Sequence, residues 1–279
     1  MFPAAAMADI RLCTGSSSGV YFAAGQEIVK MAGKNMPVTV VETEGTIDNL
    51  QRVLDTPADS PEACDAMIGQ PDGPVYIGRQ SPAKIKKLRQ VGGLHREYLQ
   101  VLCSTASGVD DLGDIADGKR SLAIGEPGSG AWLIWQNIVA EDDSYAKVPV
   151  TNEGGIIALS AVSSDVTTCM LRAAGLHDGT VMEADATFGD SVVLAEANDK
   201  DFNDATDIGG KPLYAYVDIP SGTYPKSLQT GIFGSSVSTI SWLAGVYVNT
   251  DRFTDQKQLA AFIQAVARAS LGVKAEYGQ

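Results

Sequence analysis

The sequence predicts an α/β protein of two lobes joined by two long strands. Two stretches of the chain alternate short apolar runs with helix-like segments, and this alternation is typical of a parallel sheet with helices on its faces. Two longer apolar runs, residues 98–103 and 239–248, mark where the chain crosses between the two alternations. We therefore expect the chain to leave the first lobe and return to it. Lobe 1 is predicted from residues 9–103 plus 240–279, and lobe 2 from residues 104–239.

The elements of the first lobe follow from short apolar runs and from helical periodicity. Each apolar run is too short for a helix and ends at Ser, Thr, Gly or Pro, which favours a strand followed by a turn. Between these runs, apolar residues recur at helical spacing. The expected strands are residues 10–13, 38–41, 66–68 and 98–103, and the expected helices are residues 20–31, 47–54 and 82–90.

The second lobe repeats the pattern after a polar segment rich in Gly and Asp, residues 104–118. A β-rich run at residues 236–249 then leads back to lobe 1, where helical periodicity predicts a final helix over residues 255–271. Between these two segments, the expected strands are residues 121–124, 148–150, 165–170 and 214–217, and the expected helices are residues 131–140, 156–162 and 189–197.

Composition and charge exclude some classes of function. The chain has 279 residues, of which 44% are apolar and 20% charged, as in ordinary globular proteins. Its 34 acidic and 21 basic side chains give a net charge of −13, which argues against nucleic-acid binding because that needs clustered Lys and Arg. The sequence contains no stretch of the roughly 18–20 apolar residues that a membrane span needs.

The first eight residues resemble the end of a secretory signal. Ala6, Met7 and Ala8 form a small-x-small cleavage pattern before Asp9, and an Ala-rich tail without this role is the alternative. We expect an exported, periplasmic protein on this basis.

The four cysteines lie far apart in the sequence and form no C-x-x-C pair, which argues against zinc binding and thioredoxin-like chemistry. Four cysteines can pair in three ways, and their spacing does not choose among them. Because Cys13, Cys103 and Cys169 lie in apolar runs, we expect buried free thiols.

Three turns rich in Ser, Thr and Gly each follow an apolar strand and precede a helix. They are residues 14–19, 43–46 and 125–130. The first N–H groups of a helix have no partner within the helix and attract anions, and open α/β sheets bind ligands at the carboxyl ends of their strands. We therefore predict a receptor for a small carboxylate that closes around its ligand. The predicted contacts are backbone N–H groups at Ser17–Gly19, Thr46–Ile47 and Ser129–Ala131 and hydroxyls of Ser16, Ser18, Thr46 and Ser129.

Further polar residues near the same strand ends are expected to bind the rest of the ligand. Asn49, Gln70 and Asp72 are the candidates, although a carboxylate in the position of Asp72 equally suits a turn cap. Tyr21 either lines the site or packs in the core. Gly128 and Gly130 are expected to allow close approach of the backbone.

Other kinds of site match these motifs less well. Residues 15–19 fit G-x-S-x-G, the nucleophile elbow of Ser hydrolases, but the triad would need His95 or His177 and the elbow would come unusually early. No Gly-Lys-Ser/Thr follows residues 128–130, so nucleotide binding is not expected. The Asp residues lack the spacing of a calcium loop, and we expect neither a metal nor a cofactor.

The order of the motifs resembles one transport family. Residues 14–22 (Thr-Gly-Ser-Ser-Ser-Gly-Val-Tyr-Phe) resemble the opening motif of TAXI-type solute receptors, the binding-protein component of a class of TRAP transporters. Residues 43–50, 118–130 and 219–225 are similar to later motifs of that family. The resemblance covers nearly the whole chain. It implies a two-lobed periplasmic binding protein fold, type II-like, with no catalysis.

The resemblance also implies a ligand and a partner. The ligand would be a small organic anion or amino acid, either glutamate-like or a C4–C5 dicarboxylate, which a monomeric receptor delivers to a TRAP-type membrane transporter. A binding protein of an ATP-driven importer is the alternative. By position, the implied ligand contacts are Ser16, Ser18, Tyr21, Thr46, Asn49, Gln70, Asp72, Gly128, Ser129 and Gly130. Ala131 departs from the pattern, because the family tends to have Thr there.

Overall fold

The computed structural model describes residues 9–34, 36–204, 206–229 and 235–278 and shows a mixed α/β protein with a single sheet. The predicted signal-peptide end, residues 1–8, lies outside the described residues. The chain divides into two compact units. Unit 1 contains the described residues up to Arg96, Asp207–Gly210 and those from Leu243 onward, and unit 2 contains Glu97–Thr206 and Lys211–Trp242.

Two long strands carry the chain from one unit into the other. They are β4 (Leu88–Ser104) and β10 (Val237–Asn249). The lobe boundaries expected from the sequence, after residues 103 and 239, fall inside these strands, whereas the units divide after Arg96 and Trp242.

In unit 1, three parallel strands end at the same edge of the sheet. The central strand, β1 (Ile10–Cys13), lies between β2 (Val38–Val41) and β3 (Ala66–Gly69). Cys13 is in register with Val41 and with Met67, so the turns that follow these strands lie next to one another. The last part of β10 pairs with β3 in the antiparallel direction.

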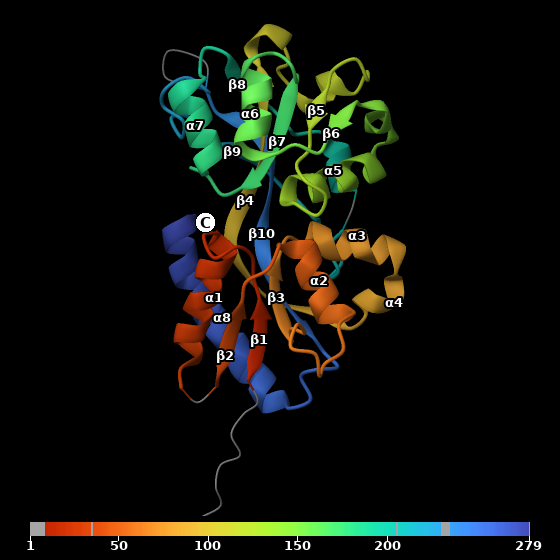
Figure 1. Ribbon diagram of the computed structural model, residues 1–279, viewed down its shortest axis with the longest axis vertical. Coiled ribbons are helices and arrows are strands. Elements are labelled where there is room, and N and C mark those ends of the chain that lie inside the picture. Colours follow the sequence, from red (N-terminus) through yellow and green to blue (C-terminus); the bar gives the residue numbers. More distant parts are fainter. Residues whose placement is uncertain (1–8, 35, 205, 230–234, 279) are drawn as a thin grey trace, which may run out of the picture. The chain divides into compact units, whose positions relative to one another are not determined.

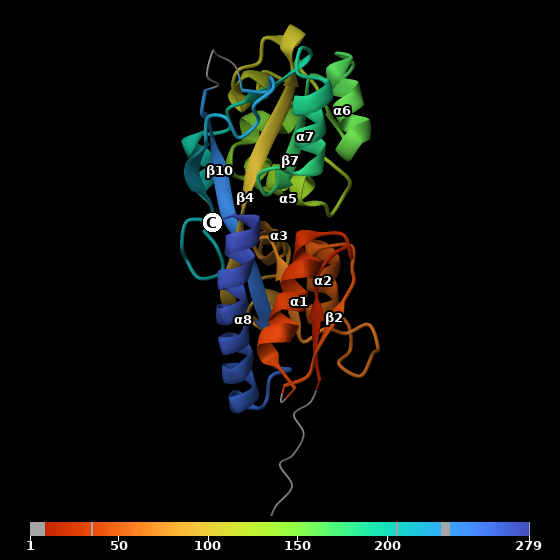
Figure 2. The same cartoon turned by 90° about the vertical axis from the view of Figure 1, so that its left-hand side faces the viewer.

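Helices cover both faces of the unit 1 sheet. α1 (Val20–Ala32) packs against the long C-terminal helix α8 (Gln256–Tyr277), and the two lie side by side in both views (Figures 1 and 2). α2 (Thr46–Leu54), α3 (Asp72–Gln80) and the short α4 (Pro82–Ile85) cover the opposite face.

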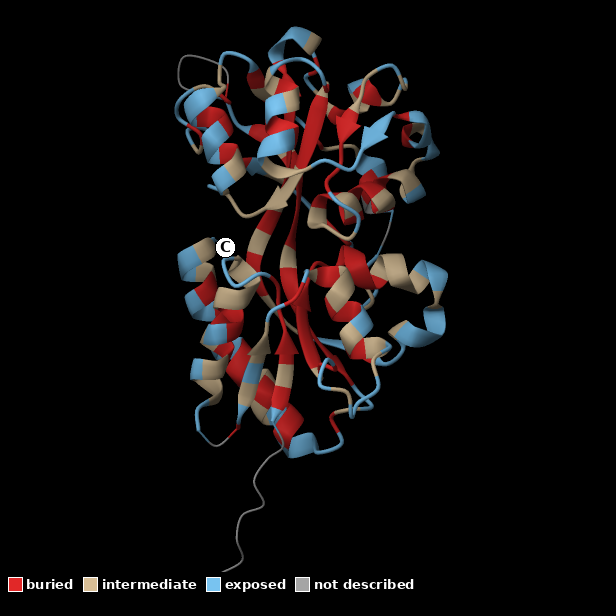
Figure 3. Ribbon diagram, in the orientation of Figure 1, coloured by how far each residue is buried: buried red, intermediate tan, exposed pale blue. Residues whose placement is uncertain are grey.

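Two hydrophobic cores lie on the two faces of this sheet, because successive side chains along a strand point to opposite faces. Ile68 and Val246 join the core under α1 and α8, whereas their neighbours Met67 and Tyr247 join the core under α2. β1, β3 and the last part of β10 are therefore buried on both sides (Figure 3), as is usual for parallel sheets in α/β proteins, whereas the edge strand β2 is only partly buried.

Unit 2 is built around a second group of parallel strands. β5 (Leu122–Ala123) lies between β6 (Val150–Thr151) and β7 (Cys169–Ala174), and β7 runs antiparallel to β4. β8 (Val192–Ala195) also pairs with β4, and β9 (Ala215–Ile219) pairs with β10. The helices are α5 (Gly130–Glu141), α6 (Gly155–Ser163) and α7 (Gly179–Thr187), with short 3₁₀ helices at Thr105–Ser107, Leu112–Ile115, Asp143–Lys147 and Lys200–Asn203.

Two of the expected helices are wrong. Residues 189–197 contain strand β8 instead, because this β-branched segment pairs with β4. The expected helix at residues 82–90 stops at Ile85, and β4 begins at Leu88. α3 and α7 were not expected from the periodicity, and the strand expected at residues 165–170 begins only at Cys169.

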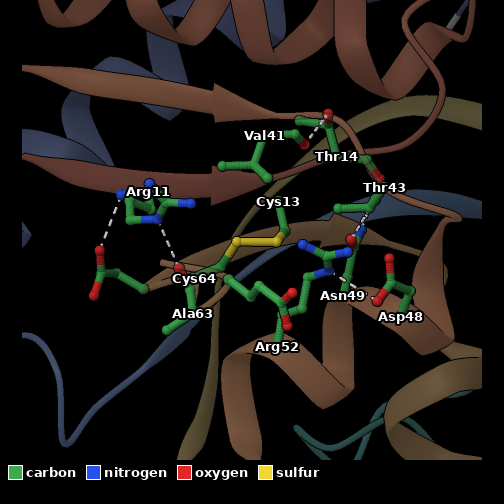
Figure 4. Close-up of a disulfide and its surroundings, with 12 residues drawn as sticks. Arg11, Cys13, Thr14, Val41, Thr43, Asp48, Asn49, Arg52, Ala63 and Cys64 are labelled. Carbon is green, nitrogen blue, oxygen red and sulfur yellow. Dashed lines mark hydrogen bonds and ion pairs between the residues drawn. A yellow bond between two sulfur atoms is a disulfide. The ribbon is translucent and has the colours of Figure 1, made fainter. Parts of the chain in front are cut away.

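The expectation of free thiols is also wrong. The cysteines are buried, but they form two disulfides, Cys13–Cys64 within unit 1 (Figure 4) and Cys103–Cys169 within unit 2. Cys103 stands directly opposite Cys169 in the β4–β7 ladder, with their Cα atoms 4.0 Å apart, and the Cα atoms of Cys13 and Cys64 are 5.8 Å apart. For Cys103 and Cys169, strand register, which the sequence does not reveal, determines the pairing.

Candidate functional site

In unit 1, backbone hydrogen bonds extend the strand ladder into the turns. The N–H of Thr14 donates to the carbonyl oxygen of Val41 at 3.0 Å, and the N–H of Thr43 donates to that of Gly15 at 3.3 Å. The first two predicted turns therefore lie side by side at the carboxyl edge of the sheet, where an open α/β sheet binds its ligands.

The side chain of Asn49 ties all three strand ends together (Figure 4). Its Nδ2 donates to the carbonyl oxygens of Thr14 at 2.6 Å and Ile68 at 2.8 Å, and its Oδ1 accepts the hydroxyl of Thr43 at 2.6 Å. Asn49 is fully buried in the first turn of α2. The sequence analysis predicted Asn49 as a ligand contact. In the structure its amide bonds to the protein, an arrangement that suits a residue that positions the loops.

Gln70 has a buried amide nitrogen without a partner. Its backbone N–H donates to the hydroxyl of Thr46 at 3.1 Å, which holds it against the first residue of α2. The Gln70 side chain is 3% exposed, and its Nε2 makes no hydrogen bond within the part of the chain that the structure describes. Such an orphaned donor is costly, and a ligand acceptor would satisfy it.

The N-terminus of α2 supplies further donors beside Gln70. Among the described residues, the N–H groups of Thr46 and Ile47 have no acceptor, as expected for the first residues of a helix. Gly73 of α3 comes so close that a Cβ atom there would lie 2.4 Å from Cγ2 of Thr46. These donors thus converge in a tightly packed corner that favours an anion.

Asp72, the first residue of α3, is completely buried next to this corner. Its charge adds to the effect of burial in raising the pKa of Tyr247. The N-terminal end of α3 favours a carboxylate at this position.

The first predicted turn already holds a carboxylate from the protein itself. The N–H of Ser17 donates to Oε1 of Glu42 at 2.6 Å, and the N–H of Gly19 donates to the carbonyl oxygen of Ser16 at 2.8 Å. The hydroxyl oxygens of Ser16 and Ser18 lie 3.1 Å apart, and all three serines are exposed. The sequence analysis did not select Glu42. Its position directly after strand β2, at the same strand end as the other candidates, is the signal that could have identified it.

Tyr21, in the first turn of α1, packs against other aromatic rings. Its ring lies 5.9 Å from the buried ring of His95, which also lies 6.2 Å from the ring of Tyr277. The half-buried Tyr21 thus belongs to the edge of the core under α1 and α8.

In unit 2, the predicted turn after β5 leads directly into α5. The hydroxyl of Ser129 caps this helix by accepting the N–H of Trp132 at 3.3 Å, and the N–H of Ser129 donates to the carbonyl oxygen of Glu126 at 2.9 Å. Gly128 has φ +90°, which L residues rarely adopt. The N–H groups of Gly130 and Ala131 have no acceptor within the described ranges.

The start of α6 lies beside this turn. A Cβ atom on Gly154 would lie 3.4 Å from Cα of Gly125, so the turns after β5 and β6 are in contact. The first turn of α6 exposes two apolar side chains, Ile156 and Ile157, which are 55% and 70% exposed. This edge of unit 2 thus combines free helix donors with apolar surface.

Tyr224, from the motif at residues 219–225, has a structural role. Tyr224 is buried, and its hydroxyl donates to Oε1 of Gln100. The hydroxyl oxygen of Tyr224 also accepts the N–H of His177 at 3.3 Å. Burial raises the pKa of this hydroxyl, so it stays protonated.

The structure therefore brings the predicted residues together in two groups, each described within its own unit. The group in unit 1 contains Ser16, Ser17, Ser18, Gly19, Thr46, Asn49, Gln70 and Asp72, and the group in unit 2 contains Gly128, Ser129, Gly130 and Ala131. Of the helices in the described ranges, none combines the length and the hydropathy that a membrane span requires.

Comparison with known proteins connects this arrangement to one family. A family model described as the NMT1-like family matches residues 12–255. No curated protein matches the chain in sequence.

Solved structures share the fold at low sequence identity. A protein from Bordetella bronchiseptica RB50 superposes with a TM-score of 0.54 at 16% identity, covering 94% of this chain and 71% of that one. IdiA (FutA) of Trichodesmium, solved with iron and citrate ligands, gives 0.52 at 12% identity, covering 97% and 85%. SsuA of Methylobacillus flagellatus KT, described as a periplasmic sulfonate-binding protein, gives 0.51 at 12% identity, covering 98% and 70%. The chain thus has the two-lobed fold of periplasmic binding proteins, as the sequence predicted.

Proposed function

The chain belongs to the NMT1-like family, and from that premise we propose that it is an extracytoplasmic solute-binding receptor without catalytic activity. Its ligand is a small organic anion or amino acid, in the class of glutamate-like molecules and C4–C5 dicarboxylates. The observation that carries the proposal is the unpartnered, buried Nε2 of Gln70 beside the free N–H groups of α2. Together these groups offer several donors to one carboxylate.

The disulfides favour a location outside the cytoplasm. One disulfide lies in each unit, and both are buried. Disulfides persist in oxidising compartments such as the periplasm and are rare in the cytosol. This supports a periplasmic protein, in agreement with the small-x-small pattern before Asp9.

We assign the partner as a TRAP-type membrane transporter, with the receptor acting as a monomer. The order of the motifs at residues 14–22, 43–50, 118–130 and 219–225 supports this choice over an ATP-driven importer. A Ser hydrolase is disfavoured because the N–H and hydroxyl of Ser17 are directed to the carboxylate of Glu42, and the ring of His95 is buried against Tyr21.

A thermal-shift screen tests the proposal directly. The protein is unfolded and refolded to remove any carried ligand and is then screened against amino acids, monocarboxylates and dicarboxylates. A ligand at 100 times its Kd adds about 2.7 kcal/mol to the free energy of unfolding, which raises the Tm by several degrees. We expect at least one carboxylate to give such a shift.

Gln70→Met provides the matched variant. Methionine keeps the approximate volume but removes the buried amide, so we expect weaker ligand binding without loss of stability in the unliganded protein. Gln51→Met on the exposed side of α2 is the control. A library without any hit, or unchanged affinity in Gln70→Met, would contradict the proposal.

A further inference from the structure

We propose that Glu42 is a specificity-determining residue that limits the negative charge of the ligand, so that the receptor takes a single net negative charge and discriminates against dianions. The inference rests on the proposed function, because it concerns ligands held by the neighbouring donors of α2. Within the proposed ligand class it favours glutamate-like amino acids, whose ammonium group balances one carboxylate, over C4–C5 dicarboxylates.

The first argument is that Glu42 already fills the first turn. Its Oε1 accepts the N–H of Ser17 at 2.6 Å, although the two residues lie 25 positions apart in the sequence. The N–H and hydroxyl of Ser17 hold the pKa of Glu42 below its usual value, so this exposed carboxylate stays ionised at neutral pH. A ligand carboxylate would have to displace a group that the chain holds at high effective concentration. The turn at residues 14–19 is therefore closed to it.

The second argument concerns the balance of charge around α2. Glu42, Glu44 and Asp48 all lie within seven residues of one another at the start of this helix. Asp48 is neutralised by Arg52, whose Nε lies 2.8 Å from its Oδ1, whereas no ion pair involving Glu42 or Glu44 occurs among the described residues. The donors of α2 and Gln70 thus accept one carboxylate in a local field that repels a second.

The test compares pairs of acids that differ in one charge but little in shape. Isothermal titration calorimetry near neutral pH measures succinamate against succinate and glutaramate against glutarate. Like charges roughly 6 Å apart in the partly screened environment of a protein surface lower affinity by about tenfold. We expect the monoanion to bind about tenfold tighter in the wild type. This ratio should fall towards one in Glu42→Gln, because glutamine can still accept the N–H of Ser17.

Glu44→Gln is the control, since it removes the same charge two residues away without touching Ser17. The discrimination should also weaken at high salt, because Glu42 is exposed. Equal affinity of the wild type for both acids overturns the inference and leaves the proposed function intact. An equal change in Glu42→Gln and Glu44→Gln overturns it too, since the effect would then come from the general field. Absence of binding by all four acids, in the wild type and in both variants, overturns the inference together with the carboxylate proposal.

Discussion

Replacing Asn49 by alanine should destabilise the edge of unit 1 that carries the candidate site. The substitution removes the donor to two backbone carbonyl oxygens and the acceptor of one hydroxyl, all at a residue without solvent exposure. Each of the three buried groups left without a partner costs roughly 1–2 kcal/mol, so the loss sums to about 3–6 kcal/mol of unfolding free energy. The Tm of unit 1 should fall by about 10 °C.

Urea unfolding followed by two probes measures this effect. The three tryptophans lie in unit 2, so their fluorescence reports on that unit, whereas far-UV circular dichroism reports on both. We expect the dichroism transition to move to lower urea in Asn49→Ala, while the exposed Asn152→Ala changes it by less than about 0.5 kcal/mol.

Asn49→Asp sharpens the test. Its ionised carboxylate would face two carbonyl oxygens, so the folded protein should raise its pKa above the unfolded value. Stability should then be greatest below the unfolded pKa and be lost as the pH rises through the folded pKa. A loss below about 1 kcal/mol in Asn49→Ala, or a pH-independent stability in Asn49→Asp, would refute the reasoning.

Three further variants have defined outcomes. Replacing both Cys103 and Cys169 by alanine opens a loop with a sequence separation of 66 and should cost about 4 kcal/mol, seen as an earlier tryptophan transition in urea. Gly73→Ala places a methyl group 2.4 Å from a methyl of Thr46, so calorimetry should show at least tenfold weaker binding of the carboxylate found by the screen. Asp185→Ala removes a buried carboxylate that accepts three consecutive backbone N–H groups and should cost about 2–4 kcal/mol in the same urea assay.

Local pattern predicted much of the fold because many elements are short and clearly bounded. The strand at Ile10–Cys13 and the helix beginning at Val20 follow from an apolar run, a polar turn and helical spacing. The sequence analysis did not predict α3, because its first turn contains Gly73 and Pro74, the two residue types with the lowest helix propensity. The sequence analysis did not predict β8, because this segment forms a strand through its pairing with β4, which the local sequence does not reveal.

The candidate site was predictable in position but not in the role of each residue. Turns after parallel strands converge for topological reasons, which is why Thr46 and Gln70 meet although they are 24 residues apart. Whether a polar side chain faces a ligand or the protein depends on its partners in space. Asn49 and Glu42 make this clear, since the first turned out to bridge loops and the second to occupy a predicted anion turn.

Hydrogen-bond partners distinguish Asn49 from Gln70, and substitution of these two residues should have opposite effects on stability. Asn49 has every polar atom engaged by the protein, so its loss should lower stability and, through displaced loops, ligand affinity as well. Gln70 keeps a buried donor without a partner among the described residues, which costs stability and, under our proposal, is satisfied when the ligand binds. Gln70→Met should therefore keep or increase stability while it lowers affinity. A residue that improves the fold when removed and impairs binding at the same time is under functional rather than structural constraint, so this contrast with Asn49, if measured, would support Gln70 as a ligand contact.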